Sequence, residues 1–410
     1  MFGSKIEAAG ESAIGDGAPR RVALFMFDFA LTGVVRNGVR IANALAADGH
    51  DVHLIVSRED GRDQHDLDSR VRVVALRPAG TRLPRSLALA GDLLALRARI
   101  AAIGPQILAS LGNHGHLPVA IASAGLAHVR RVYRISNELH RPGDGPLRRL
   151  QRRATMGIIS KGADRLLLVS RHLARNPAFI GARERGVVAV VPNGVPADTI
   201  ARAAASGPCP HPWLAGGGEP VVVAMGRLVA QKNFATLVEA VAIANRVRST
   251  RLLILGHGTA RARERLVAIA QDHGIADRVD LVGAIGNPFP YLRRATAFAL
   301  PSLWEGASNA LLEALACRVP IVASLTAGNA QEVLGHGRFG LLVEPMDTEA
   351  MAQAILWQTG PDRVCPGDRA RDFDAEAAIR ASCSALLGAL VTPPPRRARL
   401  KPSTRPSPQS

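Results

Sequence analysis

The sequence predicts an α/β protein made of two doubly wound parallel sheets that face a central cleft. Short apolar runs alternate with segments of helical periodicity, which is the pattern of a parallel sheet covered by helices on both faces. The pattern stops in a segment rich in Gly, Pro and Ala, residues 201–218, and then starts again. A chain of 410 residues is long enough for two such domains.

The first half of the chain supplies the first sheet. Arg21–Phe27 is an apolar run that suits a buried strand. The glycines from Gly33 to Gly38 mark a loop, and Val39–Ala47 then has the spacing of a helix. Further strands are expected at Val52–Val56, Ile107–Leu111, Arg131–Ile135, Arg165–Ser170 and Val187–Val191.

The second half repeats the alternation. A helix is expected at Asn233–Val247. Strands are expected at Val221–Met225, Leu252–Leu255, Val279–Val282, Thr296–Leu300 and Pro320–Ala323. The predicted domains are therefore residues 20–200 and 219–391, joined by a linker at 201–218. Residues 392–410 are rich in Pro, Arg and Ser and are expected to form a disordered basic tail.

Charge and composition restrict the partners. The formal net charge is +17, and most of the excess lies in the first 200 residues and the tail. This charge suits an anionic partner such as lipid head groups or a phosphorylated substrate, but a solvated Arg-rich surface explains it equally well. Aromatic residues make up only 4% of the chain and no nucleic-acid-binding module is recognised, so no nucleic-acid partner is expected.

The cysteines, the first residues and the longest uncharged stretch together predict the cellular compartment. The four cysteines form no CxxC pair, which favours a reducing compartment without a structural zinc site. The first residues lack the apolar segment of a signal peptide. The uncharged stretch Ile100–Val129 is broken by Gly104-Pro105 and by a Gly/His loop, so it is too short to span a bilayer. We expect a cytoplasmic protein, soluble or peripheral on the inner face of the cytoplasmic membrane.

A strand-to-helix loop in the second domain is a candidate phosphate site. Arg227 follows the apolar strand directly, and Lys232 precedes the helix that starts at Asn233. The free N–H groups and dipole of a helix N-terminus favour phosphate, and two long cations strengthen that preference. An exposed basic loop without a ligand is the alternative.

A second candidate segment is Trp304–Ala316. Glu305 lies in a loop, Ser308 or Asn309 can cap the following helix, and Glu313 lies within that helix. Two carboxylates eight residues apart can contact opposite ends of one ligand, with the helix N-terminus between them. A capped amphipathic helix with two solvated acids is the alternative.

Taken together, these segments resemble the family 4 retaining glycosyltransferases, which have the GT-B architecture of two Rossmann-like domains. The resemblance extends from about Arg21 to Ile355, and residues 287–316 look especially like the bacterial branch that builds lipopolysaccharide, capsule and related surface glycans. The motifs that carry it are Gly33, Ala163-Asp164-Arg165, Val169-Ser170, Val191-Pro192-Asn193-Gly194-Val195, Gly226-Arg227-Leu228 with Gln231-Lys232, Leu255-Gly256-His257-Gly258, Asn287–Leu292 and Ser302–Ala316.

The resemblance implies a donor, an acceptor and residue roles. Arg227 and Lys232 would bind the diphosphate of a nucleotide-sugar and stabilise its charge as the glycosidic bond breaks. Glu305 would contact the donor sugar, and Glu313 would hold the ribose hydroxyls. The amides from Gly306 to Ala310 would contact sugar and phosphate.

The acceptor implied is a glycan or a lipid-linked molecule. Gly33 would allow the first-domain loop to approach the diphosphate closely. The family often has a histidine after the strand that here ends at Ile135, and Asn137 stands in its place as a candidate donor contact. His114 and His116 are candidates to face the cleft, although a loop histidine without a role is the alternative.

The sequence gives little support for a bound metal or cofactor. The triplets Asp66-Leu67-Asp68 and Asp372-Phe373-Asp374 do not suggest a metal clamp, so no metal and no cofactor are expected.

Leu83–Ile103 can form an amphipathic helix and Leu147–Ala154 carries four arginines, which suggests contact with an anionic membrane surface. An ordinary core helix is the alternative for Leu83–Ile103. A non-catalytic sugar-nucleotide-binding or membrane-scaffolding protein of the same fold is the alternative function.

Overall fold

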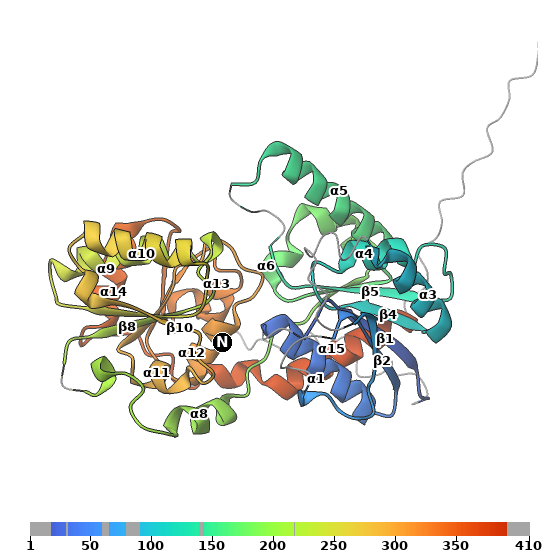
Figure 1. Cartoon of the computed structure of the whole chain (residues 1–410), viewed down its shortest axis with the longest axis horizontal. Coiled ribbons are helices and arrows are strands. Elements are labelled where there is room, and N and C mark those ends of the chain that lie inside the picture. Colours follow the sequence, from blue (N-terminus) through green and yellow to red (C-terminus); the bar gives the residue numbers. More distant parts are fainter. Residues whose placement is uncertain are drawn as a thin grey trace, which may run out of the picture.

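The computed structural model describes residues 18–29, 32–59, 65–78, 91–138, 141, 143–216 and 218–391. Two α/β lobes lie side by side (Figure 1). Each contains one sheet whose described strand pairs are all parallel, and helices cover both faces. The predicted fold class, two doubly wound sheets facing one another, is confirmed.

The first lobe has a seven-stranded sheet in the order β3-β2-β1-β4-β5-β6-β7. Its strands are β1 (Arg21–Met26), β2 (Asp51–Arg58), β3 (Arg72–Arg77), β4 (Ile107–Ser110), β5 (Arg130–Ile135), β6 (Arg165–Leu168) and β7 (Val188–Val190). Its helices are α1 (Gly33–Ala47), α3 (Leu93–Ile103), α4 (His116–Ala122), α5 (Pro146–Gly162), α6 (Arg171–Ala174) and α7 (Ile180–Glu184).

The second lobe has a six-stranded sheet in the order β10-β9-β8-β11-β12-β13. Its strands are β8 (Val221–Met225), β9 (Arg251–Leu255), β10 (Val279–Gly283), β11 (Ala297–Leu300), β12 (Ile321–Ser324) and β13 (Leu341–Val343). The later helices are α8 (Ala197–Ala205), α9 (Phe234–Asn245), α10 (Ala260–Asp272), α11 (Phe289–Arg294), α12 (Asn309–Ala316), α13 (Ala330–Val333), α14 (Thr348–Gln358) and α15 (Ala375–Leu387).

The loop expected from Gly33 to Gly38 is instead the start of α1, so that expectation is wrong. The hydroxyl of Thr32 accepts a hydrogen bond from the Val35 amide at 3.3 Å and caps the helix at Gly33. A side chain at Gly38 would come within 2.4 Å of the Met26 sulfur, so this glycine allows α1 to pack closely on β1. Two edge strands, β3 and β13, were missed because the first is only half-buried and the second has three residues.

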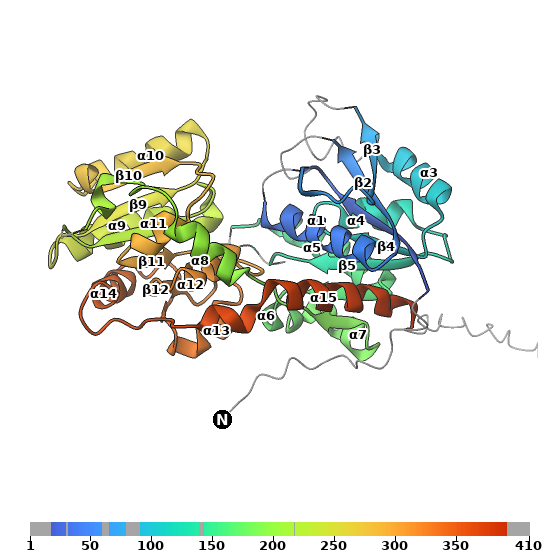
Figure 2. The same cartoon turned by 90° about the horizontal axis from the view of Figure 1, so that it is seen from below.

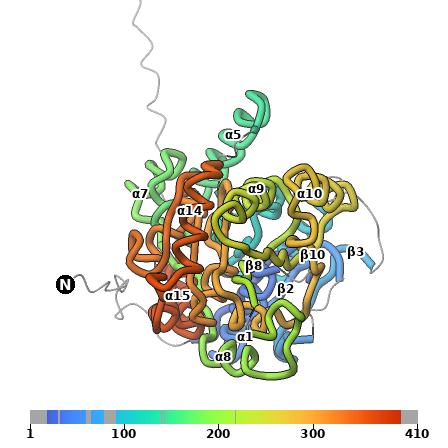
Figure 3. Tube along the Cα trace, turned by 90° about the vertical axis from the view of Figure 1, so that its left-hand side faces the viewer, coloured from blue at the N-terminus to red at the C-terminus, as the bar shows by residue number. Residues whose placement is uncertain are grey.

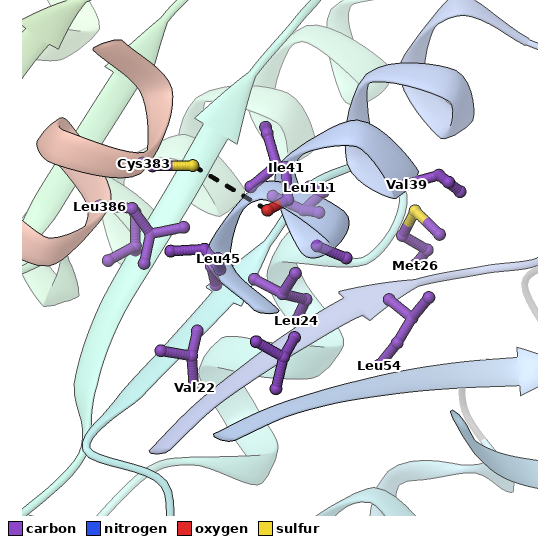
Figure 4. Close-up of a cluster of buried hydrophobic side chains, with 14 of the residues drawn as sticks. Val22, Leu24, Met26, Val39, Ile41, Leu45, Leu54, Leu111, Cys383 and Leu386 are labelled. Atoms are coloured by element: carbon purple, nitrogen blue, oxygen red, sulfur yellow. Dashed lines mark hydrogen bonds between the residues drawn. The ribbon is translucent and has the colours of Figure 1, made fainter. Parts of the chain in front are cut away.

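The predicted domain limits are corrected at two places. Helix α8 occupies the first residues of the segment expected to be a linker. Helix α15, expected in the second domain, packs on the first lobe (Figure 2). There Leu386 joins the core that contains Val22 and Leu24, and the thiol of Cys383 donates to the carbonyl of Ile41 at 3.9 Å (Figure 4). The chain therefore crosses between the lobes twice.

Candidate functional site

The candidate site lies where two loops leave the second sheet. Strand β8 has β9 on one side and β11 on the other, so the strand order reverses at β8. In open parallel sheets, ligands bind outside the carboxyl ends of the strands at this reversal. The loop after β8 carries Arg227 and Lys232, and the loop after β11 carries Glu305. The topology thus brings together the segments selected from the sequence.

The ammonium group of Lys232 forms an ion pair with Glu305. Gly226 has φ 154°, a conformation that favours glycine, and a side chain there would come within 2.9 Å of the Lys232 side chain. The aliphatic part of Lys232 therefore packs on Gly226 and is directed toward the second loop. Arg227 is exposed in the same turn.

Glu305 is held from several sides. It is 8% exposed, and its Oε1 accepts a hydrogen bond from the Ser302 hydroxyl at 3.0 Å. The amide of Gln231 donates to the Trp304 carbonyl at 2.9 Å and to Glu305 Oε2 at 3.4 Å. Because a buried carboxylate requires paired charge or hydrogen bonds, these contacts hold the Glu305 side chain in place beside Lys232.

The N-terminus of α12 has no side-chain cap. Ser308 stands at the N-cap position, but its hydroxyl makes no capping hydrogen bond, so the expected capping role is wrong. Asn309 hydrogen-bonds to Asn193 instead. Buried polar atoms with no hydrogen-bond partner among the described residues include Asn233 Nδ2, Trp304 Nε1 and Ser308 Oγ. The uncapped amides and these atoms are groups that an anionic ligand can satisfy.

Glu313 lies one turn further along α12. Burial raises the pKa of its carboxyl, while the guanidinium groups of Arg36 and Arg40 and the ammonium of Lys232 oppose that shift. Arg36 Nη1 lies 3.8 Å from Glu313 Oε1. The carboxyl is therefore a partly buried acceptor between α12 and α1, close to both lobes.

Loops of the first lobe close over this region. A side chain at Gly306 would come within 2.3 Å of the Ser136 carbonyl and 2.7 Å of Asn137 Cα, so the two loops touch. At Gly33 a side chain would collide with the Asn309 amide at 1.7 Å. Both predicted first-lobe contacts, Gly33 and Asn137, therefore lie at the interface with the α12 segment.

The guanidinium group of Arg141 is a further cation, in the first lobe and close to the second. Burial lowers the pKa of Arg141, and the nearby guanidinium groups of Arg152 and Arg227 lower it further, while Asp144 opposes the shift. Arg227 is therefore close to the first lobe, although it belongs to the second. The candidate phosphate site is bordered by positive charge from both lobes.

A buried network that the sequence analysis did not assign joins the lobes. Arg134 is 4% exposed, burial alone lowers its pKa to about 10, and its Nη2 donates to Asn193 Oδ1 at 2.6 Å. Asn37 Nδ2 donates to the same oxygen at 3.3 Å. The Asn193 amide then donates to Asn309 Oδ1 at 2.9 Å. The signal in the sequence was an arginine placed between Tyr133 and Ile135, near the apolar end of the expected strand.

The two histidines differ in position. His114 is exposed on the loop before α4. His116 is 1% exposed, its Nδ1 lies 2.7 Å from the Ser110 hydroxyl, and its ring meets the edge of Tyr133. Burial lowers the pKa of His116 to about 3, so the ring is neutral. The expectation that His116 faces the cleft is therefore wrong, because its ring is part of the first-lobe interior.

A cavity of about 170 Å³ lies between the lobes beside Glu313. Residues of α1 and α12 that line it include Gly33, Arg36, Asn37, Arg40, Asn309 and Glu313. Within the described ranges, no cluster of three or more His, Cys, Asp or Glu side chains could hold a metal ion. Across the same part of the chain, no helix has the length and apolar character that crossing a membrane requires.

Comparisons with curated proteins give relatives in surface-glycan synthesis. An N-acetylgalactosamine-N,N'-diacetylbacillosaminyl-diphospho-undecaprenol 4-alpha-N-acetylgalactosaminyltransferase of Campylobacter jejuni is 32% identical over 174 residues, which cover 41% of this chain and 46% of that protein. The lipopolysaccharide core biosynthesis glycosyltransferase LpsE of Rhizobium meliloti is 37% identical over 136 residues, covering 33% of this chain and 38% of the relative. The matched segments thus span less than half of each relative.

Solved structures show the same architecture. A glycosyltransferase from Rickettsia africae superposes with a TM-score of 0.70 at 17% identity, covering 91% of this chain and 99% of that structure. Anabaena HepE in complex with UDP superposes with a TM-score of 0.69 at 18% identity, covering 89% and 99%. At these identities the likeness establishes the fold.

The family is established by two sequence profiles, one for each lobe. Residues 31–199 match Glycosyltransferase Family 4. Residues 219–358 match Glycosyl transferases group 1. The two matches contain the strand-to-helix loop with Arg227 and Lys232, the α12 segment with Glu305 and Glu313, and the facing loops of the first lobe. The chain belongs to the family 4 glycosyltransferases and has their GT-B fold.

Proposed function

We propose that this protein transfers a sugar from a nucleotide-sugar donor to a glycan or lipid-linked acceptor, with retention of anomeric configuration. The product belongs to lipopolysaccharide, capsule or exopolysaccharide synthesis. The observation that carries the proposal is the Lys232–Glu305 ion pair, with Arg227 in the same loop and the uncapped N-terminus of α12 beside it. This combination suits a diphosphate bound next to a sugar.

Each residue of the candidate site has a separate role in the proposed sugar transfer. Arg227, Lys232 and the α12 amides stabilise the negative charge that develops on the leaving diphosphate. Glu305, buried and held by Ser302 and Gln231, accepts hydrogen bonds from sugar hydroxyls. Glu313 accepts hydrogen bonds from the ribose. Charge stabilisation of this kind requires no metal ion, so the reaction is proposed to be metal-independent.

Two similar proteins support a nucleotide-sugar donor and a lipid-linked acceptor. Solved structures of Anabaena HepE are complexes with UDP and with UDP-glucose. The Campylobacter jejuni relative is named for a diphospho-undecaprenol acceptor. A lipid-linked acceptor brings this protein to the inner face of the cytoplasmic membrane, where its basic first lobe meets anionic lipid.

The test is a thermal-stability screen of the purified protein against UDP, GDP, ADP and UDP-glucose. A ligand at a hundred times its dissociation constant adds about 2.7 kcal/mol of stability, so one nucleotide is expected to raise the melting temperature clearly. The Arg227→Ala variant should lose this gain. Arg380→Ala is the matched control, because Arg380 is an exposed arginine on α15. The absence of any nucleotide effect, or an equal effect in Arg227→Ala, contradicts the proposal.

A further inference from the structure

Arg134 is a buried cation that has only neutral partners. It lies on β5 with 4% of its surface exposed, and burial is the single cause that lowers its pKa. Within the described part of the chain, no carboxylate forms an ion pair with its guanidinium group. A buried charge without a counter-charge is costly, so Arg134 is explained better by what it orients than by the stability that it adds.

The guanidinium group sets the orientation of the Asn193 amide. A guanidinium group donates hydrogen bonds and accepts none, so the atom of Asn193 that faces Arg134 Nη2 at 2.6 Å is the oxygen, Oδ1. Asn37 Nδ2 donates to the same oxygen at 3.3 Å. The amino group of Asn193 then points the other way and donates to Asn309 Oδ1 at 2.9 Å. A side chain that only donates thereby decides which end of this amide faces the second lobe.

The same reasoning fixes the amide of Asn309. Its oxygen accepts from Asn193, so its amino group, Nδ2, is directed toward the first residue of α1. A Cβ atom at Gly33 would come within 1.7 Å of Asn309 Nδ2. No acceptor for this amino group is found among the described residues. The chain of hydrogen bonds that begins at Arg134 therefore ends in an amino group with free donors.

This amino group lies where the N-termini of two helices meet. Helix α1 begins at Gly33 and α12 at Asn309, and both residues line the cavity between the lobes. Thr199 and Ile200 of α8 also line it, and α8 lies close to α1 in the view along the long axis of the molecule (Figure 3). The hydroxyl of Ser308, at the uncapped start of α12, is buried and has no partner among the described residues. Free donors at helix N-termini favour an anion.

We propose that Arg134 is a positioning residue for the donor site: through Asn193 it holds the Asn309 amide with its amino group toward the phosphate of the bound donor. In the reversed orientation the same amide would direct its oxygen at the phosphate and repel it. Arg134 acts through two other side chains and does not touch the ligand. The identity of the ligand rests on the proposed function, whereas the orientation of the amides does not.

The orientation is imposed across the interface between the lobes. Arg134 and Asn193 belong to the first lobe, and Asn309 belongs to the second. Only Asn193 connects the buried cation to α12 in this chain of hydrogen bonds. A change in the hydrogen-bonding character of residue 193 should therefore reverse the amide of Asn309 without altering Arg134.

The test measures the affinity of the full chain for inorganic diphosphate, and for UDP, GDP and ADP, by isothermal titration calorimetry. Asn309→Ala removes one donor to a charged group and should weaken diphosphate binding on the order of tenfold. Asn193→Asp should weaken it further. The new carboxylate accepts from Arg134 and also from the amino group of Asn309, so the Asn309 oxygen turns toward the anion.

The double variant Asn193→Asp/Asn309→Ala separates orientation from charge. In the wild-type background, Asn309→Ala removes a favourable donor. In the Asn193→Asp background, it removes an unfavourable oxygen. The same substitution should therefore weaken diphosphate binding in the first background and restore part of it in the second. The added negative charge is present on both sides of the second comparison, so charge alone does not produce this change of sign.

Variants of Arg134 separate orientation from packing. Arg134→Lys keeps a side chain that only donates, whereas Arg134→Gln can present either an oxygen or an amino group to Asn193. If both orientations are then equally populated, the diphosphate affinity of Arg134→Gln falls about twofold, and it falls further if the reversed one dominates. Arg134→Lys should lose less. Melting temperatures identify any variant that is not folded, and the variants of Asn193 and Asn309 test the inference without changing Arg134.

Two controls have hydrogen bonds that stay within one lobe. Arg185 donates to the Ser160 carbonyl at 2.6 Å, so Arg185→Gln is the control for Arg134→Gln. The amide of Asn245 donates to the carbonyls of Val241 and Thr250, so Asn245→Ala is the control for Asn309→Ala. Neither control should change the affinity for diphosphate.

Three outcomes overturn the inference. Wild type can fail to bind inorganic diphosphate, Asn309→Ala can weaken binding equally in both backgrounds, or a folded Arg134→Lys can lose as much affinity as Arg134→Gln. Failure of the proposed function looks different. In that case UDP, GDP and ADP bind no more tightly than inorganic diphosphate, while the change of sign for Asn309→Ala persists with inorganic diphosphate.

Discussion

Asn193, which follows the last strand of the first sheet, donates a hydrogen bond from its amide to Oδ1 of Asn309, the first residue of α12, at 2.9 Å. The acceptor oxygen of Asn193 is shared by Arg134 and Asn37 of the first lobe. One side chain therefore connects a buried arginine of the first lobe to the helix N-terminus that forms the candidate diphosphate site.

Two substitutions of Asn193 should have different effects. Asn193→Ala leaves the buried Arg134 and Asn37 without their acceptor and should cost about 1–3 kcal/mol in the free energy of unfolding. Asn193→Asp keeps an acceptor for Arg134 and should preserve stability, but it loses the donor to Asn309 and should lower turnover. Urea denaturation and an activity assay measure the two effects. Wild-type turnover in Asn193→Asp would show that the link between the lobes is not needed.

Arg227→Ala should reduce turnover on the order of a hundredfold or more, as expected when one preorganised charge-stabilising donor is removed. Its folding should be unaffected, because Arg227 is exposed. Lys232→Ala should reduce turnover similarly and also lower stability, since it leaves the buried Glu305 without its ammonium partner. Steady-state kinetics together with melting temperatures distinguish the variants. If both turn over as wild type does, the assigned diphosphate site is incorrect.

Turnover should persist in excess EDTA. The positive charge needed at the leaving diphosphate is expected from Arg227, Lys232 and the α12 amides, which a chelator does not remove. The measurement is sugar transfer after dialysis against EDTA, compared with a sample to which magnesium or manganese is returned. Loss of activity that the metal restores would reveal a metal site that these residues do not supply.

Glu313→Gln should separate stability from function. Because burial raises the pKa of Glu313 above 4.5, its ionised form is disfavoured by folding at neutral pH. Removing the charge should therefore raise the melting temperature at neutral pH.

The pH dependence of Glu313→Gln supplies its control. The gain in stability should shrink as the pH falls through the raised pKa, because wild-type Glu313 then becomes neutral as well. The proposed function further predicts that nucleotide affinity falls in the variant, because an amide would replace the carboxylate proposed to accept hydrogen bonds from the ribose. A loss of stability at all pH values would mean that pairing with Arg36 outweighs the cost of burial.

The sequence by itself determined the fold class and supplied the candidate residues of the donor site. Strands and helices differ in hydrophobic periodicity, which can be recognised within a short segment of sequence. This pattern predicted the ends of most of the strands that it identified to within one or two residues. Arg227, Lys232, Glu305 and Glu313 became candidates because their segments, taken together, resemble the family 4 glycosyltransferases. Because parallel strands have their carboxyl ends at the same edge of a sheet, the loops that follow β8 and β11 are expected to lie close together.

The tertiary structure alone decided which distant residues are partners. Asn193 and Asn309 are 116 residues apart, and nothing in either local sequence specifies their hydrogen bond. The burial of His116 and Arg134, and the return of α15 to the first lobe, also depend on how whole elements pack. Helices α3 and α5 both carry apolar and basic residues, yet Leu96, Ile100 and Ile103 of α3 are buried, whereas Leu147, Leu150 and Ile158 of α5 are exposed. Periodicity reveals that a helix has an apolar face, whereas only the packed structure shows what covers it.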